Sequence, residues 1–334
     1  MIRLVVPLLA LLSLSAIVAC GGDDAETLTI YSGRSESLVQ PILDQFEEES
    51  GVKVRVRYGD TAELAATILE EGGNSPADVF FAQDAGALGA LADAGLLKTL
   101  PSMVLDLAPS QYRSQADLWV GISGRARVVA YNTDVLSPDD LPDSIFGFTA
   151  PEWEGRIGWA PQNGSFQAFV TGLRVLEGDD AARDWLEGIM ANNPTEYPNN
   201  TTSLEGVANG EVDVAFVNHY YLFRFLEEEG DGFRARNFYT GPGDAGSLVN
   251  IAGAGILKTT NSNDLAEQFL RYMLGTTAQQ YFADETYEYP VIDGIAIQEG
   301  LVPLAEIRPP DIDLSDLSDL NGTLDLLRET GALP

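Results

Sequence analysis

The sequence predicts an α/β protein with two lobes, each a mostly parallel sheet flanked by helices, and two extended strands that cross between the lobes. Short apolar runs alternate with amphipathic helical patterns from Leu28 onward, as they do in a series of βαβ units. Two strand-like stretches, at 119–131 and 248–257, interrupt this series far apart in the chain. With 45% hydrophobic residues among 334, the chain is globular and long enough for a core in each lobe.

The amino-terminal segment has the features of a lipoprotein signal peptide. Residues 4–19 are apolar except for two serines and a proline, and small residues stand directly before Cys20. The apolar run is shorter than the roughly 20 residues that a membrane-spanning helix needs. We therefore expect residues 1–20 to be a signal peptide with Cys20 as the lipidated residue, and residues 21–27 to be a tether. This predicts an exported protein, held by lipid alone on the outer side of the cytoplasmic membrane, at the cell surface or in the periplasm.

Composition excludes several classes of site and partner. Cys20 is the only cysteine, so lipidation leaves no thiol for a disulfide or a metal site. Fifty-one acidic residues against nineteen basic ones give a formal charge of -32, which repels nucleic acid and anionic lipid headgroups at long range. We therefore expect no nucleic-acid partner and no membrane contact beyond the lipid.

Lobe 1 is predicted to begin with three strand and helix pairs. The strand patterns lie at 28–31, 52–58 and 78–81, and the helical patterns at 35–49, 61–71 and 85–94. The second crossing stretch is expected to return the chain to this lobe, where helical patterns at 265–274 and 277–283 follow. Lobe 1 therefore receives residues 28–127 and 250–301.

Lobe 2 is predicted to contain residues 128–249 and 302–334. Its helical patterns lie at 166–176, 181–190 and 203–208, and its strand patterns at 157–160 and 212–217. An acidic helical pattern at 314–329 is expected to pack back across lobe 2. Two crossings between lobes form a hinge, around which the lobes close on a ligand.

Two adjacent tyrosines follow the strand pattern at 212–217. Tyr220 and Tyr221 stand at a strand-to-helix junction, and ligands of α/β folds bind at the carboxyl ends of strands. Neighbouring residues entering a helix point about 100° apart, so the two rings are not expected to share one core face. Tyr is also common at half-buried helix starts, and spacing alone leaves both interpretations open.

Polar residues precede two of the predicted helices of lobe 2. Asn163-Gly164-Ser165 and Asn200 would present backbone N–H groups and polar side chains at helix amino termini, where an anion is favoured. Helix capping without a ligand is the alternative for both.

Enzyme chemistry has little support in the sequence. His219 is the only histidine, and no Gly-x-Ser-x-Gly motif is present. Neither the glycine pattern at 241–246 nor the acidic run at 311–316 has the context of a nucleotide or calcium site. A lone histidine more often has a structural role than a catalytic one, and His219 remains only a minor candidate for a role beside the ligands.

The chain resembles the ferric iron-binding subunits of bacterial ABC importers over nearly all of its length after the signal peptide. The most specific matches are the Ser-Gly-Arg-x-Arg stretch at 123–127 and the paired tyrosines; those at 28–33, 76–81 and 163–166 are shared more widely among solute-binding proteins. The resemblance implies a type II fold like that of periplasmic binding proteins. It also implies Tyr220 and Tyr221 as phenolate ligands of Fe(III), with phosphate or carbonate as a second, synergistic ligand. The residues implied around that anion are Asn163, Gly164, Ser165, Asn200 and Asn218.

Lobe 1 departs from this family pattern. Family members with a His and a Glu ligand carry them where this chain has Ser35 and Gln83, and the third tyrosine of others corresponds to Gln162. Ser35 is alternatively the N-cap of the first helix. Three remedies are open: Asp84 or Tyr31 replaces the missing ligands, additional anions or water coordinate, or the cargo is a ferric chelate or an organic anion. Arg34, Arg125 and Arg127 would hold such an anion, or would instead pair with carboxylates.

We therefore expect a monomeric solute-binding lipoprotein, not an enzyme, that delivers Fe(III) to an ABC permease and its ATPase. Hard oxygen donors suit Fe(III), and its charge favours loss of the phenol proton. The alternatives in the same fold are a ferric chelate or a small organic or phosphorylated anion as cargo. A hydrolase or lyase that depends on His219, and a surface protein that binds a partner without transport, are the competing classes.

Overall fold

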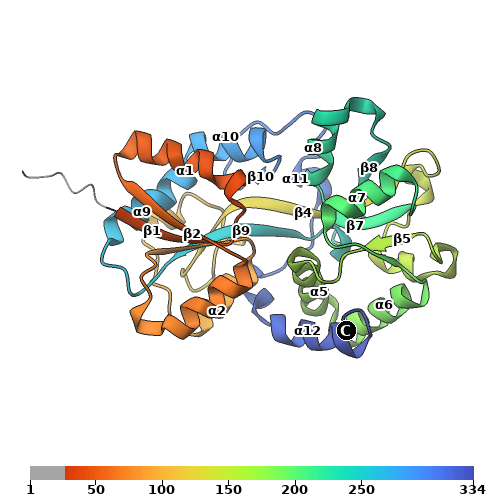
Figure 1. Cartoon of the computed structure of the whole chain (residues 1–334), viewed down its shortest axis with the longest axis horizontal. Helices are drawn as coiled ribbons and strands as arrows, with labels where there is room; N and C mark the ends of the chain where they lie inside the picture. The colour runs from red at the N-terminus through yellow and green to blue at the C-terminus, as the bar shows by residue number, and fades with distance from the viewer. Residues whose placement is uncertain (1–26) are drawn as a thin grey trace, which may run out of the picture.

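The structure is a computed structural model that describes residues 27–334, arranged in two lobes side by side (Figure 1). The predicted signal peptide with Cys20, and the predicted tether up to residue 26, lie outside the described residues. Within residues 27–334 no helix is long and apolar enough to cross a membrane.

Each lobe has its own sheet and flanking helices. Lobe 1 contains the strands β1 Thr27–Ser32, β2 Lys53–Tyr58, β3 Val79–Ala82 and β10 Tyr289–Pro290, and the helices α1 Glu36–Ser50, α2 Thr61–Glu71, α3 Ala85–Asp93, α4 Ser102–Leu105, α9 Asn263–Met273, α10 Thr276–Glu285 and α11 Leu304–Ile307. Lobe 2 contains the strands β5 Ile157–Trp159, β6 Thr195–Glu196, β7 Val214–Asn218 and β8 Ala235–Phe238, and the helices α5 Gly164–Glu177, α6 Asp179–Ala191, α7 Asn200–Asn209, α8 Tyr220–Glu229 and α12 Leu320–Glu329.

The strands β4 Val120–Asn132 and β9 Val249–Ile256 join the lobes. Their neighbours place them at the centre of one continuous path of strands, β2-β1-β3-β9-β4-β7-β5-β6. The pairs β1·β2, β1·β3, β5·β7 and β5·β6 are parallel, whereas β9 and β4 pair antiparallel with each other and with their outer neighbours β3 and β7. Each lobe is thus parallel at its outer side and antiparallel at the crossing.

β4 passes from one lobe to the other within a single strand. Its residues up to Ala126 pair with β9, and those from Arg127 onward pair with β7. All thirteen residues of β4 are buried, because helices or neighbouring segments cover it along its whole length. The predicted crossing strand is therefore buried along its whole length, and the change of partner at Ala126 and Arg127 marks the boundary between the lobes.

The carboxyl-terminal segment differs from its prediction. The single helix expected at 314–329 is broken at Asp319 into the short turn η8 Leu314–Ser318 and helix α12, with the Asp319 side chain accepting a hydrogen bond from Gly322 N at 3.0 Å. Leu314 and Leu317 pack in the core of lobe 1, although we predicted all of 302–334 in lobe 2. α12 does pack on lobe 2, against α5. The chain thus crosses between the lobes a third time.

Glycines allow this third crossing to lie close to both lobes. A Cβ on Gly86 of α3 would lie 2.4 Å from the Leu317 carbonyl oxygen, which is too close for a larger residue unless the backbone shifts. On the other side, a Cβ on Gly172 of α5 would lie 3.8 Å from the Leu317 side chain, which is ordinary contact. The turn η8 therefore packs between α3 of lobe 1 and α5 of lobe 2.

Candidate metal and anion site

The tyrosine pair stands at the first two positions of α8, directly after β7. Tyr220 is buried and Tyr221 is half-buried. Their rings stack on each other with centroids 4.3 Å apart and planes 27° apart. Only Tyr220 is fully buried, and the two rings contact each other, which the sequence argument did not predict.

Cationic side chains surround the two phenols. The guanidinium of Arg224, one turn further along α8, lies 5.2 Å from the Tyr220 ring centroid and 5.7 Å from that of Tyr221. One buried nitrogen of Arg224 has no hydrogen-bond partner in the structure. Burial raises the pKa of the Tyr221 phenol, with Tyr220 adding to the rise, while Arg224 and Arg125 oppose it. The Tyr221 phenol is thus neutral near neutral pH, beside cations that favour its anionic form.

A polar cluster lies beside the tyrosines at three helix and strand ends. Asn200 donates to Asn163 Oδ1 at 3.0 Å and to Ser165 Oγ at 3.1 Å, and its own Oδ1 accepts from Asn218 N at 3.0 Å. Arg127 donates to Asn218 Oδ1 at 3.0 Å and reaches Ser165 Oγ at 3.4 Å. Three elements of lobe 2 and the crossing strand thus meet at one point, and we name these five residues the polar cradle.

The caps of the two helices explain how the cradle forms. Asn163 caps α5, accepting from Ser165 N at 3.1 Å, so the predicted capping role and the predicted clustering are both present. Gly164 is exposed at the first turn of α5. The cap of α7 is Asn199, which forms a capping box with Thr202. Because Asn199 takes the capping role, Asn200 is left free to join the cradle.

Arg127 gives the cradle a positive charge in a buried place. The residue is 4% exposed, and Phe216 O accepts a second hydrogen bond from it at 2.8 Å. Burial lowers the pKa of Arg127 to about 9, and the phenols of Tyr221 and Tyr220 oppose that shift. A buried cation without a carboxylate partner favours an anion beside it.

The lobe 1 side of the cleft is built from a pair of arginines on one carboxylate. Arg34 donates to both oxygens of the buried Glu288, at 2.9 and 2.7 Å, and to Gln83 Oε1 at 2.7 Å. Arg125 lies 3.9 Å from Glu288 and donates to the Gln83 carbonyl oxygen. The Arg34 and Arg125 cations lower the pKa of Glu288 against the effect of its burial. Two arginines thus share Glu288, and the Asp84 carboxylate also lies near Arg125. We name Arg34 and Arg125 the arginine rim.

Several residues considered for the cleft serve other purposes in the structure. The Tyr31 hydroxyl donates to Glu71 at 3.0 Å and accepts from Arg57 at 3.2 Å, so it is engaged on the β2 side of lobe 1. Ser35 occupies the N-cap position of α1 without a capping side-chain bond and is exposed. Asp84 caps α3, accepting from Ala87 N at 3.1 Å. The exposed Gln162 is bonded to Glu196 at 3.0 Å.

His219 has a structural role, which a lone histidine has more often than a catalytic one. It is fully buried, its Nδ1 accepts from Ala126 N at 3.1 Å, and Nε2 donates to the Tyr287 carbonyl oxygen at 2.8 Å. Burial lowers the pKa of His219 to about 4, so the ring is neutral near neutral pH. The histidine thus ties the start of α8 to the crossing strand and to lobe 1.

The donor set defines what the site can hold. Among residues 27–334 no cluster of three or more His, Cys, Asp or Glu side chains is arranged for a metal. The oxygen donors that the structure brings together at the start of α8 are the phenols of Tyr220 and Tyr221. Hard oxygen donors of this kind suit a trivalent ion better than a soft one.

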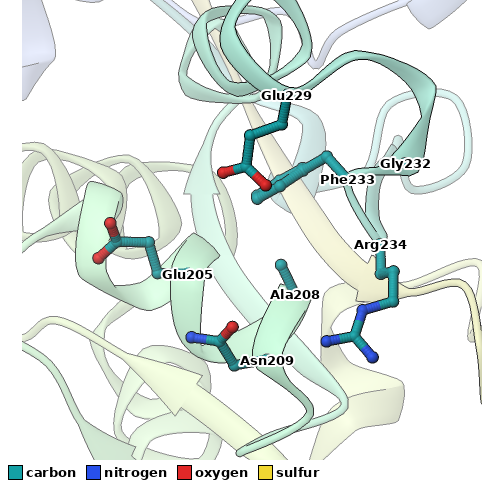
Figure 2. A pocket seen from close by; sticks show the side chains of 7 residues that line it. All are labelled: Glu205, Ala208, Asn209, Glu229, Gly232, Phe233 and Arg234. Carbon is teal, nitrogen blue, oxygen red and sulfur yellow. The ribbon is translucent and has the colours of Figure 1, made fainter.

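A separate pocket lies on lobe 2, away from the tyrosine rings. It has a volume of about 190 Å³ and is lined by α7, the end of α8 and the segment that leads to β8 (Figure 2). Its lining residues are Glu205, Ala208, Asn209, Glu229, Gly232, Phe233 and Arg234. Arg234 pairs with Asp134 at 3.2 Å, and both side chains are about half exposed. None of the lining residues belongs to the cradle or to the tyrosine pair.

Comparison with known proteins agrees with this architecture. The family described as bacterial extracellular solute-binding protein matches residues 42–300. The "Major ferric iron-binding protein" of Neisseria meningitidis serogroup B is 32% identical over 95% of this chain and 97% of that protein. The "Fe(3+)-binding periplasmic protein" of Serratia marcescens is 33% identical over 97% of each.

Solved structures share the fold. Iron-bound HitA from Pseudomonas aeruginosa is 36% identical, with a TM-score of 0.86 over 92% of this chain and 99% of that one. A Trichodesmium protein (IdiA, FutA) in complex with iron and citrate ligands is 30% identical, with a TM-score of 0.80 over 91% and 99%. The predicted two-lobed type II fold is thereby confirmed. The chain belongs to the family of bacterial extracellular solute-binding proteins, together with these ferric iron-binding relatives.

Proposed function

We propose that the protein captures Fe(III) between its lobes and delivers it to an ABC permease and its ATPase. Tyr220 and Tyr221 act as phenolate ligands. The observation that carries this proposal is the stacked pair of phenols beside three arginines at the end of β7, because cations lower the cost of forming two phenolates. The iron-binding relatives at 32% to 36% identity support the same cargo.

The polar cradle is the proposed place of a synergistic anion such as phosphate or carbonate. Asn163, Ser165, Asn200 and Asn218 offer amide and hydroxyl groups, Arg127 supplies charge, and Gly164 adds backbone N–H at the start of α5. The anion would neutralise part of the charge that remains when two phenolates bind a trivalent ion. It would also occupy coordination positions that the protein leaves open.

A ferric chelate is the second candidate cargo, and lobe 1 favours it. Gln83 offers only a neutral oxygen, which already accepts from Arg34, and Ser35 points to solvent. The arginine rim therefore suits an anionic chelator more than a bare cation. The Trichodesmium relative bound with iron and citrate is consistent with this choice.

The remaining parts of the proposal concern location and partners. We infer that the protein is anchored through Cys20 by lipid alone, acts as a monomer, and catalyses no reaction. The family of solute-binding transport proteins supports an extracytoplasmic role. Labelling with radioactive palmitate, and its loss in Cys20→Ala, tests the anchor.

Titration of the purified protein with ferric citrate and with ferric nitrilotriacetate tests the cargo. Binding of Fe(III) by phenolates produces a visible charge-transfer band, and we expect it with the parent and with Tyr58→Phe, a matched loss of a hydroxyl within lobe 1. Tyr220→Phe and Tyr221→Phe should each weaken the band. Retention of citrate after gel filtration separates chelate from bare ion.

A further inference from the structure

A short segment of lobe 1, residues 286–289, contacts both lobes with alternating side chains; we name it the 286–289 connector. Toward lobe 1, Glu288 accepts from Arg34, from Ser123 Oγ at 2.9 Å and from Thr286 Oγ1 at 3.2 Å. The Glu288 side chain is fully buried and is held by its ion pair with Arg34. Glu288 therefore anchors the connector in the lobe that carries the arginine rim.

The opposite side of the connector holds α8. The Tyr287 ring stacks on Phe223 with centroids 5.7 Å apart and planes 27° apart, and its hydroxyl donates to Glu227 Oε2 at 2.8 Å. The Tyr287 carbonyl oxygen accepts from His219 Nε2 at 2.8 Å. Three groups of one residue thus bind three points of lobe 2, all of them on α8 or directly before it.

Two of these points lie on the same face of α8 as Tyr220, one of the two proposed iron ligands. Positions three and seven residues after Tyr220 lie on the same side of a helix, and they are Phe223 and Glu227. Tyr220 and Phe223 are both buried and pack in the core of lobe 1, although α8 belongs to lobe 2. The orientation of the phenol therefore depends on how this face docks on Tyr287.

The backbone of Tyr287 has an uncommon conformation. Its φ of 57° lies in the left-handed region, which a bulky aromatic residue adopts only when its surroundings impose it. Burial, followed by the bond to Glu227, raises the pKa of the Tyr287 phenol to about 12, so the hydroxyl stays a donor. The strained backbone lets the carbonyl and the ring face lobe 2 while Glu288 faces lobe 1.

We propose that Tyr287 is a positioning residue for the metal site, which holds α8 against lobe 1 and thereby fixes the place of the two ligand tyrosines. The inference rests on the proposed function, because it concerns the binding of Fe(III) at the start of α8. Tyr287 touches no cargo in this account. It acts through Phe223, Glu227 and His219.

Tyr287→Phe tests the inference, because it removes only the hydroxyl that reaches Glu227. Tyr281→Phe is the matched control, since the Tyr281 hydroxyl donates to Leu38 O at 2.9 Å entirely within lobe 1. For each variant we would measure the rate of iron release to excess chelator, the wavelength and intensity of the charge-transfer band, and the thermal midpoint of the iron-free protein. Glu227→Leu removes the same bond from the other side and serves if Tyr287→Phe does not fold.

We expect Tyr287→Phe and Glu227→Leu to release iron about tenfold faster than the parent, because each loses a hydrogen bond that involves a charged group. The charge-transfer band should shift in both, and the double variant should release iron no faster than either single one. Tyr281→Phe should leave release and band unchanged. Release within twofold of the parent and an unshifted band in both variants, with only the thermal midpoint lowered, would show a purely structural role. A parent without any charge-transfer band would overturn the proposed function itself.

Discussion

Asn200→Asp is the sharpest perturbation of the proposed anion site. The change keeps the size of the side chain, and it keeps an oxygen in the place of Asn200 Oδ1, which accepts from Asn218 N at 3.0 Å in the structure. It removes the donors to Asn163 Oδ1 and Ser165 Oγ, and it places a negative charge in the cradle. Two unit charges about 5 Å apart at an effective dielectric constant of about 20 repel by about 3 kcal/mol. Phosphate affinity should therefore fall about 100-fold.

Calorimetric titration with phosphate, in the presence and absence of Fe(III), measures this loss. The new carboxylate also neutralises Arg127, which lies 3.5 Å from Asn200 Oδ1, so both effects act in the same direction. Asn192→Asp is the control, because Asn192 is a buried lobe 2 amide bonded to Phe148 O and Ala150 O, away from the cradle. Phosphate binding by Asn200→Asp as tight as that of the parent would refute the assignment of the cradle.

Three further predictions concern pH and packing. The pKa of His219 is about 4 in the folded protein and 6.5 in the unfolded chain, so the unfolded chain binds more protons between these values. The free energy of unfolding should therefore decrease by about 2 kcal/mol between about pH 7 and pH 5. Urea unfolding measures this decrease, which His219→Gln should lack. Iron affinity should rise with pH, because the raised pKa of Tyr221 means that binding releases its proton, and a chelator competition that shows no slope would contradict this. Leu317→Ala should lower the free energy of unfolding in urea by about 2–4 kcal/mol, because the side chain is 2% exposed in the core of lobe 1. A decrease below about 0.5 kcal/mol would show that η8 is not part of that core.

Much of the fold follows from patterns that are local in the sequence. The helix at Thr61–Glu71 is predicted to the residue, because Asp60 provides a cap and the apolar spacing is regular. The crossing strands are also found, since both are long strand-like stretches, although Arg125 and Arg127 interrupt the apolar pattern of β4 and are themselves buried. The short strands β6, β8 and β10 are missed, because two to four residues carry too little periodicity to stand out.

The site is only partly readable from the sequence. Tyr220, Tyr221 and the cradle residues are visible because they follow strands or precede helices. Arg224 had a detectable signal, its spacing of four residues from Tyr220, which places it on the same face of α8. Glu288 had none, because its partnership with Arg34 joins residues 254 positions apart.

The break at Asp319 shows a different limit. The apolar spacing from Leu314 to Leu327 suits one continuous helix, but the residues on either side of Asp319 belong to the cores of different lobes. Packing against two bodies outweighs local helical preference there. Sequence periodicity shows that a segment is amphipathic and does not show how many partners it has.

Resonance Raman spectra of the protein loaded with Fe(III), excited in the visible band, test the central claim most directly. Tyrosinate bound to iron has ring vibrations that are enhanced by such excitation, and the spectrum of the parent should show them. We predict that the double variant Tyr220→Phe, Tyr221→Phe loses these vibrations together with the visible band. Enhanced tyrosinate vibrations that persist in the double variant would place the iron elsewhere and contradict the account.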